Sequence, residues 1–381
     1  MKRILIFSTA YYPFVGGAEV AIKEITDRLA DDYEFEMLTA LMDKKLPRLE
    51  KVGNVLVHRL GWGCPKLDKL YLAAFGQIKG LKLHRQKNYQ VVWAIMASFG
   101  GLAASKFQRR TGLKYLLTLQ EGDPLELILK KVRLFRPAFN KIFSRADALQ
   151  AISRYLYDWG VRMGFKGALA EVIPNGVDVG RFTADFDLRE IQAVRNSFGF
   201  LPDAKIIVTA SRLEVKNGLE DVIRALTQLP QNYCFYVCGA GELETKLKIL
   251  TKASGLERRV NFAGFKSHED LPKILKASDI FIRPSLTEGL GNSFLEAMAV
   301  GLPTIGTLVG GISDFLQDGA TGLVCEPKNP ESIARAIIRA GEMSADVKKS
   351  LHQNAMKIIN ERYNWEYISG RMDKMFKGLI G

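Results

Sequence analysis

The stretch VIPNGVDVGRF, residues 172–182, separates two halves of the sequence that carry the same pattern. Its centre, PNGVD, combines a proline without a backbone N–H, an Asn-Gly pair that tolerates positive φ and an aspartate that can cap a helix. Such a composition is typical of a hinge. Apolar runs alternate with helix-length segments before the hinge, and the alternation starts again after it. The pattern therefore predicts two domains of the α/β class.

Short apolar runs that alternate with helices predict parallel sheets with helices on both faces, that is, two doubly wound domains facing a central cleft. The 381 residues suffice for both cores, since single cores stop growing at roughly 250–300 residues. We expect strands at 3–8, 35–40, 54–60, 90–96, 114–119, 147–152 and 169–173, and after the hinge at 205–210, 233–238, 258–262, 279–283, 303–306 and 322–325. We expect helices at 17–30, 69–86, 99–111, 125–145, 218–228, 241–254, 293–300 and 330–341.

The bulk composition indicates a folded protein without a membrane span or a metal site. The first residues, MKRILIFSTAYYPF, lack a small-residue cleavage site and are interpreted as a strand rather than a signal peptide. No window approaches the roughly 18 apolar residues of a membrane-spanning helix. The four cysteines form no CxxC pair, which favours reduced thiols in a cytoplasm, and the four scattered histidines favour no zinc site.

The positive charge is concentrated in one region. Residues 66–145 contain 16 Lys and Arg against four Asp and Glu, a net charge of +12 out of the +13 of the whole chain. Basic residues alternate with apolar ones in KGLKLHRQK (79–87) and LKKVRLFRPAFNKIFSR (129–145). Such segments favour an anionic surface or a phosphorylated partner, although a solvated face is the simpler alternative. No recognition motif accompanies the charge, so nucleic acid is not expected as a partner.

Ligands of doubly wound domains bind beyond the carboxyl ends of the strands, so the strand-to-helix loops are the candidate site. Gly16 and Gly17 precede a helix whose free amides attract phosphate, although a tight turn explains two glycines equally well. Arg212 and Lys216, in TASRLEVKNG, are placed to bind a diphosphate. CGAGELE (238–244) repeats the glycine pattern after another strand, while the dinucleotide motif GxGxxG is absent.

The stretch EGLGNSFLE (288–296) carries two glutamates eight positions apart. Glu288 lies in a loop, and Glu296 lies on the first turn of the following helix, which Asn292 or Ser293 could cap. A hydrolytic acid and base would face each other about 5–9.5 Å apart. A loop carboxylate and a helix carboxylate fit better as two contacts on one ligand.

Several motifs together resemble those of the retaining nucleotide-sugar glycosyltransferases of family 4, which have the GT-B fold of two Rossmann-like domains. The resemblance runs along nearly the whole chain, and the motifs follow in the family's order at similar spacing. They are GGAE, PNGVD, SRLEVKNG, GAGELE, EGLGNSFLE, GLPTIGTLVGGISDFLQDGATGLV (301–324) and YNWE (363–366).

The resemblance assigns roles to these residues. Arg212 and Lys216 would stabilise the leaving nucleoside diphosphate without a metal or another cofactor, while Glu288 would contact the transferred sugar. Glu296 would bind the ribose hydroxyls, and Gly16 and Gly17 would reach the donor when the cleft closes. The remaining donor contacts implied are Gly239, Gly241, Phe265, Gly289, Leu290, Gly291, Asn292 and Ser293.

The sequence departs from the family in TLQEGDP, where many members carry a histidine that contacts the donor sugar. Gln120 takes that position, and glutamine can donate and accept hydrogen bonds but cannot titrate. We therefore expect Gln120 or Glu121 to bind a sugar hydroxyl. Arg154 is expected to face the acceptor. The DFD sequence containing Asp185 and Asp187 is interpreted as a helix cap at 187–198 rather than a metal site.

The resemblance implies a retaining hexosyltransferase that uses a UDP- or GDP-linked sugar in cell-surface glycan biosynthesis. Residues 1–177 would receive a lipid-linked, phosphorylated or saccharide acceptor, 178–362 would bind the donor, and a helix within 363–381 would cross back to the first domain. The +12 region predicts a cytoplasmic enzyme attached peripherally to an anionic membrane face. A sugar-nucleotide epimerase of the same fold and a non-catalytic nucleotide-sugar binding protein are the alternatives.

Overall fold

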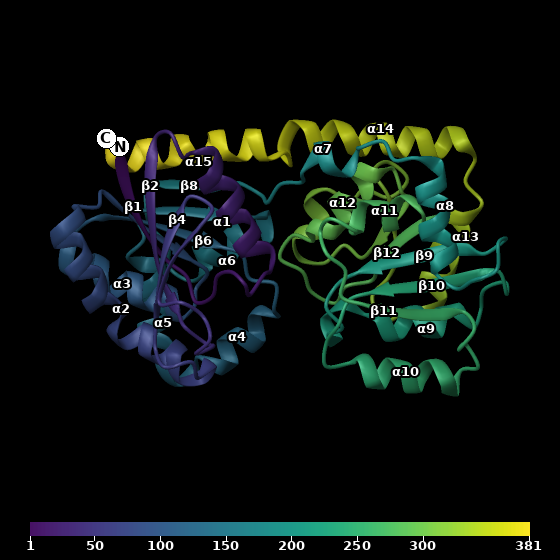
Figure 1. Cartoon of the computed structure of the whole chain (residues 1–381), viewed down its shortest axis with the longest axis horizontal. Helices are drawn as coiled ribbons and strands as arrows, with labels where there is room; N and C mark the ends of the chain where they lie inside the picture. The colour runs from purple at the N-terminus through teal and green to yellow at the C-terminus, as the bar shows by residue number, and fades with distance from the viewer. The chain divides into compact units, whose positions relative to one another are not determined.

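The computed structural model describes all residues, 1–381, and divides them into two compact units. Unit 1 comprises Met1–Gly176 and Trp365–Gly381, and unit 2 comprises Val177–Asn364 (Figure 1). The units end within two residues of the boundaries expected from the sequence. Each unit is a sheet covered by helices, so the expected pair of doubly wound α/β domains is confirmed.

Unit 1 contains an eight-stranded sheet in the order β3-β4-β2-β1-β5-β6-β7-β8. All neighbouring strands are parallel except β3, which pairs antiparallel with β4 and was not predicted. Residues Ile4 to Phe7 of the central strand are fully buried, as expected for a strand with helices on both faces. The strands are β1 (Lys2–Phe7), β2 (Tyr33–Ala40), β3 (Leu49–Val52), β4 (Val55–Leu60), β5 (Val91–Ile95), β6 (Lys114–Leu119), β7 (Ala148–Ala151) and β8 (Leu169–Val172).

The helices of unit 1 cover both faces of this sheet. Its helices are α1 (Gly17–Arg28), α2 (Pro65–Lys87), α3 (Phe99–Thr111), α4 (Leu125–Lys131), α5 (Arg136–Ser144), α6 (Arg154–Arg162) and α15 (Trp365–Ile380). α1 and α15 share the core of one face, whereas α2 and α3 pack together on the other. The single helix expected at 125–145 is wrong, because a 3₁₀ turn, Arg133–Phe135, separates α4 from α5. Pro137 then takes an early position in α5, where its missing N–H has no cost.

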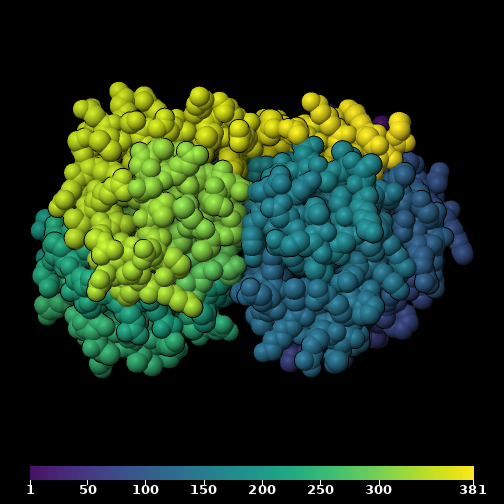
Figure 2. All heavy atoms as spheres, turned by 180° about the vertical axis from the view of Figure 1, so that it is seen from behind, coloured from purple at the N-terminus to yellow at the C-terminus, as the bar shows by residue number.

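α15 completes the core of unit 1, although it follows unit 2 in the sequence. Its Trp365, Ile368, Met372 and Phe376 are buried in one apolar cluster with residues of β1, β2 and β5. The ring of Phe376 lies 5.2 Å from that of Trp93 on β5. Figure 2 shows these last residues, in yellow, above the teal and blue residues of unit 1.

Unit 2 contains a six-stranded parallel sheet in the order β11-β10-β9-β12-β13-β14. The core of one face is formed by α9, α10 and α13, while α8, α11 and α12 pack together outside that core. The strands are β9 (Lys205–Ala210), β10 (Tyr233–Cys238), β11 (Val260–Gly264), β12 (Ile280–Arg283), β13 (Thr304–Gly306) and β14 (Leu323–Val324). The helices are α7 (Val179–Phe182), α8 (Leu188–Ser197), α9 (Leu219–Leu226), α10 (Glu244–Ala253), α11 (Leu271–Lys276), α12 (Asn292–Val300), α13 (Pro330–Gly341) and α14 (Ala345–Arg362).

The strand order of each sheet reverses at one place, between β1 and β5 in unit 1 and between β9 and β12 in unit 2. Loops that leave neighbouring strands at such a reversal run to opposite faces, which opens a binding position at the carboxyl edge. The expected Asp187 cap is confirmed, since its carboxylate accepts a hydrogen bond from the Arg189 amide at the start of α8. None of the helices combines the length and the apolar character that a membrane crossing requires.

Candidate functional site

The loop after β9 holds two cations on either side of one carboxylate. Glu214 pairs with Arg212 at 2.8 Å and with Lys216 at 3.4 Å. The Lys216 side chain is 13% exposed, whereas that of Arg212 is 69% exposed. Asn217, which is buried, donates a hydrogen bond of 2.6 Å to the Arg212 carbonyl and closes the loop. The two predicted diphosphate ligands therefore lie together, with Glu214 as their common partner.

The glycines of the loop after β10 allow close contact with the loop after β9. A Cβ atom on Gly239 would lie 1.8 Å from the Ser211 carbonyl oxygen, and one on Gly241 would lie 2.5 Å from that of Leu213. Both positions therefore require glycine. Phe265, which follows β11, is 78% exposed. The predicted glycines thus pack against the chain itself, and the exposed ring of Phe265 is available to a ligand.

The loop after β12, which contains Glu288, is joined to the loops on either side of it. The Leu286 amide donates a hydrogen bond of 2.6 Å to the Lys216 carbonyl, across the reversal of strand order. On the other side, the Gly311 amide donates to the Glu288 carbonyl at 3.1 Å. The structure therefore brings the predicted diphosphate and sugar ligands to the same edge of unit 2.

The Glu288 carboxylate is held by an arginine that the sequence analysis did not select. Arg283, the last residue of β12, donates to Glu288 Oε2 at 2.5 Å. Glu288 Oε1 accepts from the amide of Gly289 at 3.0 Å. The two side chains are only 8% and 16% exposed, respectively. Glu288 is thus a fixed, ion-paired hydrogen-bond acceptor.

Glu296 has different surroundings. Its residue is 7% exposed, and its carboxylate accepts no hydrogen bond from the protein. Burial raises the pKa of Glu296, while the charges of His268, Arg283 and Arg181 oppose that rise. An acceptor with no donor in the protein can receive hydrogen bonds from a ligand. The two glutamates of the motif are therefore not equivalent.

The start of α12 differs from the expectation. Neither Asn292 nor Ser293 caps the helix, because Gly291 takes the N-cap position with φ of 98°. The Ser293 hydroxyl accepts a hydrogen bond of 3.0 Å from Arg283 instead. Glu296 is the fifth residue of α12 and so lies beyond its first turn. No side chain therefore closes the N-terminus of this helix.

The carboxyl edge of the unit 1 sheet carries the other predicted residues, in separate loops. Gly16 is the N-cap of α1 and Gly17 its first residue. The Gly16 amide already donates to the Glu19 carboxylate at 2.9 Å. A phosphate at this amide would have to replace that bond.

Gln120 and Glu121 follow β6 and lie in different environments. Gln120 Oε1 accepts a hydrogen bond of 3.0 Å from Asn175 of the PNGVD hinge. Glu121 is 3% exposed and accepts from the Ala97 amide at 2.6 Å, while its other oxygen has no partner. Burial raises the pKa of Glu121 to about 7. Gln120 is thus the more accessible of the two residues expected to bind a sugar.

Arg154 begins α6 after β7, with a side chain that is 67% exposed. Its guanidinium pairs with Asp158 at 3.0 Å and lies 4.9 Å from the ring centre of Tyr157. The side chain is therefore accessible, and its role toward an acceptor stays a prediction.

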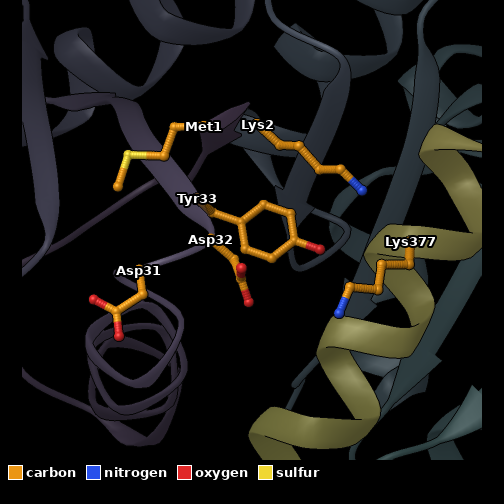
Figure 3. Close-up of a pocket in the computed structure, with 6 residues that line it drawn as sticks. All are labelled: Met1, Lys2, Asp31, Asp32, Tyr33 and Lys377. Carbon is orange, nitrogen blue, oxygen red and sulfur yellow. The ribbon is translucent and has the colours of Figure 1, made fainter.

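A hollow of about 280 Å³ lies in unit 1, between the residues drawn in Figure 3. It is found at the amino ends of β1 and β2, where Lys377 of α15 points toward it. It contains none of the predicted site residues; its lining residues are Met1, Lys2, Asp31, Asp32, Tyr33 and Lys377. Nowhere does the chain gather three His, Cys, Asp or Glu side chains in a metal-binding arrangement.

Three residues that organise these loops were not predicted from the sequence: Arg283, Glu214 and Asn175. A charged residue at the end of an apolar strand, as in IFIRPS, is a signal that could have identified Arg283, because charged residues are rarely buried without a partner. Glu214 lies between two selected cations and could have been recognised as their partner. No local signal marks Asn175 as the partner of a residue 55 positions away.

Comparisons with known proteins agree with this arrangement. Residues 15–181 match the model of Glycosyltransferase Family 4, and residues 190–358 match that of Glycosyl transferases group 1. An uncharacterized glycosyltransferase of Methanocaldococcus jannaschii is 31% identical over 209 residues, which span 54% of this chain and about half, 53%, of that protein.

A second relative is the GDP-mannose-dependent alpha-(1-6)-phosphatidylinositol monomannoside mannosyltransferase of Mycolicibacterium smegmatis. It is 29% identical over 304 residues, 75% of each chain. Among solved structures, the sucrose-phosphate synthase of Thermosynechococcus elongatus superposes with a TM-score of 0.87 at 20% identity over 100% of this chain and 99% of its own. The two family models, which match consecutive parts of the chain, and the fold together establish that the chain belongs to the family 4 glycosyltransferases with the GT-B fold.

Proposed function

We propose that the chain is a retaining, metal-independent hexosyltransferase that uses a UDP- or GDP-linked sugar. The observation that carries this proposal is the junction of two loops in unit 2, where the Leu286 amide donates to the Lys216 carbonyl. This hydrogen bond ties the loop of Arg212 and Lys216 to the loop of Glu288. Cations for a diphosphate and an acceptor for sugar hydroxyls then lie at one edge.

Arg212 and Lys216 bind the donor diphosphate and stabilise the charge that develops on it as the sugar leaves. Their shared partner, Glu214, keeps both cations near the position before a donor arrives. A preorganised cation costs no rearrangement during the reaction, which is the basis of electrostatic catalysis. Lys216 contributes more than Arg212, because it is far less exposed to screening by solvent.

Glu296 binds the ribose hydroxyls. Its carboxylate is buried and has no donor within the protein, so two hydroxyl donors would satisfy it. Glu288 lies toward the sugar, where its position is fixed by Arg283. No protein base is needed in this scheme, because the leaving phosphate accepts the acceptor's proton on the same face of the sugar.

Unit 1 receives the acceptor, and we place an anionic lipid surface against α2. The outward side of α2 is apolar at Leu67, Leu70, Phe75 and Ile78, each about half exposed. The ring of Trp62, 61% exposed, contacts Tyr71 at 4.8 Å and extends this apolar stripe. Interfacial helices combine an apolar stripe with Lys and Arg in this way.

The charge of α2 fits the same partner. The helix carries six Lys and Arg against one acid, Asp68. Asp68 is buried and accepts hydrogen bonds from the amides of Met42, Trp62, Gly63 and Cys64, so it presents no charge to a surface. The relative named for phosphatidylinositol monomannoside is consistent with a lipid-linked acceptor.

A donor panel tests the chemistry. UDP-glucose, UDP-galactose, GDP-mannose and GDP-glucose are incubated with the protein, and released nucleoside diphosphate and sugar products are measured. We expect release from at least one donor, and its loss in Lys216→Ala and Glu288→Ala. Full turnover by Glu288→Ala contradicts this site. Conversion of the sugar while it stays on the nucleotide indicates an epimerase instead, and binding without turnover indicates a non-catalytic protein.

Sedimentation with vesicles tests the surface. The wild type is expected to bind vesicles containing anionic lipid at low salt, and less at high salt, because surface charges are screened. Leu70→Asp and Phe75→Asp should weaken binding, whereas the matched control Leu201→Asp, at an exposed leucine of unit 2, should not. Equal sedimentation with neutral and anionic vesicles would contradict the proposed contact of α2 with an anionic lipid surface.

A further inference from the structure

Arg283 makes more contacts with the Glu288 loop than an ordinary ion pair requires. Its three guanidinium nitrogens each donate to a different side chain: Nε to the Ser285 hydroxyl at 3.2 Å, one terminal nitrogen to that of Ser293 at 3.0 Å, and the other to Glu288 at 2.5 Å. The three acceptors belong to the loop and helix start that follow Arg283 in the chain. The guanidinium is thus the centre around which this segment is folded.

Other parts of the loop and of α12 also pack closely around the Arg283 guanidinium. It lies 4.6 Å from the centre of the Phe294 ring, a cation–π contact. A Cβ atom on Gly291 would lie 3.0 Å from one of its nitrogens. The Arg283 residue is only 6% exposed. The side chain is therefore enclosed by the loop and is not presented to a diphosphate or a sugar.

We propose that Arg283 is a positioning residue for the transfer reaction, a role that depends on the function proposed above. It acts through Glu288, whose carboxylate it fixes where the transferred sugar binds, and through Ser293, which it holds at the open N-terminus of α12. Neither Lys216 nor Glu296 hydrogen-bonds to Arg283, and on Glu296 it acts only through its charge. Arg283 consequently governs the rate of transfer more than the affinity for the donor.

The test compares kinetics of four variants, with water as the acceptor and the best donor of the panel as the substrate. In Arg283→Met we expect kcat for nucleoside diphosphate release to fall roughly 10- to 100-fold, because hydrogen bonds to charged groups are lost, with donor KM within about three-fold. Arg283→Lys should recover part of kcat, because it keeps one charge that can reach Glu288. In a Glu288→Gln background, Arg283→Met should lower kcat little further, because Arg283 acts through Glu288.

The matched control is Arg195→Met. Arg195 also makes three hydrogen bonds, to Ala277, Ala204 and Asp279, at the opposite end of the same strand β12. Thermal unfolding of each variant measures its structural cost. If Arg283 is only structural, Arg283→Met and Arg195→Met should lower stability and activity in parallel, which overturns the proposal.

The remaining outcomes are also decisive. Losses that add up fully in the Arg283→Met, Glu288→Gln double variant, or a change in KM alone, overturn the positioning role and leave the proposed function intact. If Arg283→Met does not fold, Arg283→Lys replaces it. The kcat of Arg283→Lys, alone and combined with Glu288→Gln, is then judged by the same criteria. A wild type that turns over no donor overturns the proposed function, and the positioning role with it.

Discussion

The carboxyl edges of the two sheets solve the same architectural problem in different ways. In unit 2 this edge carries Lys216, Glu288 and Glu296, and a hydrogen bond from the Leu286 amide to the Lys216 carbonyl joins the loops of the first two. In unit 1 the polar groups are largely occupied within the protein, Gly16 by Glu19 and Glu121 by Ala97. Unit 2 is thus built for strong electrostatic contacts, whereas unit 1 offers fewer and weaker ones.

The largest effect is expected for Lys216→Ala, which removes the less exposed of the two cations proposed to bind the diphosphate. We expect kcat to fall roughly 100- to 1000-fold, the range found when one preorganised charge-stabilising group is removed. Arg212→Ala should cost less, because its side chain is mostly exposed. Nucleoside diphosphate release measures both. The control is Lys248→Ala, whose ammonium pairs with Glu244 on α10. Equal losses at Arg212 and Lys216 would contradict the argument from burial.

A second prediction concerns Glu121 and the stability of unit 1. Because burial raises its pKa from about 4.5 to about 7, its contribution to stability is present below about pH 4.5 and is lost as pH rises through about 7. Glu121→Gln keeps the acceptor for Ala97 without a charge. We expect it to be more stable than the wild type at pH 8 by up to about 3 kcal/mol, and equal to it near pH 4.

Denaturant unfolding, monitored by hydrogen exchange of the unit 1 amides, measures this difference in stability between Glu121→Gln and the wild type. Glu126→Gln, at an exposed position of α4, is the control and should show no such pH dependence. If the free energies of unfolding of wild type and Glu121→Gln stay parallel from pH 4 to 8, ionisation of the buried carboxyl does not destabilise unit 1. The contrast between the two edges would then weaken.

Glu296→Gln tests the ribose contact. We expect donor KM to rise roughly 10- to 100-fold, as for loss of a hydrogen bond to a charged group, with a smaller change in kcat. Wild type should lose affinity for a 2′-deoxy or 3′-deoxy donor, and Glu296→Gln should lose little more. Because burial raises the pKa of Glu296, donor affinity should fall at acid pH in the wild type and not in the variant. An undiminished preference for ribose in Glu296→Gln rules out this contact.

The smallest effect is expected for Gln120→Ala in unit 1. Loss of one neutral hydrogen bond, about 1 kcal/mol, corresponds to a change of roughly five-fold in turnover. Asn175→Ala removes the partner that orients Gln120 and should have a similar effect. Assays of the donor panel with each variant measure it. Steady activity on every donor and acceptor would mean that Gln120 does not take over the place of the family histidine.

Most site residues of unit 2 could be predicted because they lie in short local sequence motifs. Arg212, Lys216 and Glu288 lie in loops that follow strands with clear apolar runs, Glu296 lies on the helix after one of these loops, and the parallel sheet brings the loops to one edge. The residues that organise them could not be predicted as readily. Arg283 lies inside an apolar strand, and its three partners are set by the path of the following loop rather than by spacing.

Unit 1 was less predictable for a related reason. The break between α4 and α5 arises inside a continuous basic and apolar segment, so periodicity did not reveal it. The antiparallel strand β3 has an exposed, irregular pattern, LEKV, that resembles a loop. The partner of Glu121 is a backbone amide, which carries no sequence signal at all.

The return of α15 to unit 1 has a consequence for the order in which the chain folds during synthesis. Domains generally fold as units, in the order in which the ribosome releases them. Here the first unit to be made lacks α15, one of the two helices that share a face of its sheet, and α15 follows all 188 residues of unit 2. Unit 2 can therefore finish folding before unit 1 does. Until Trp365 and Phe376 are synthesised, Phe35 and Trp93 lack apolar partners from α15. We therefore expect the nascent chain to be most prone to aggregation in unit 1, the part synthesised first.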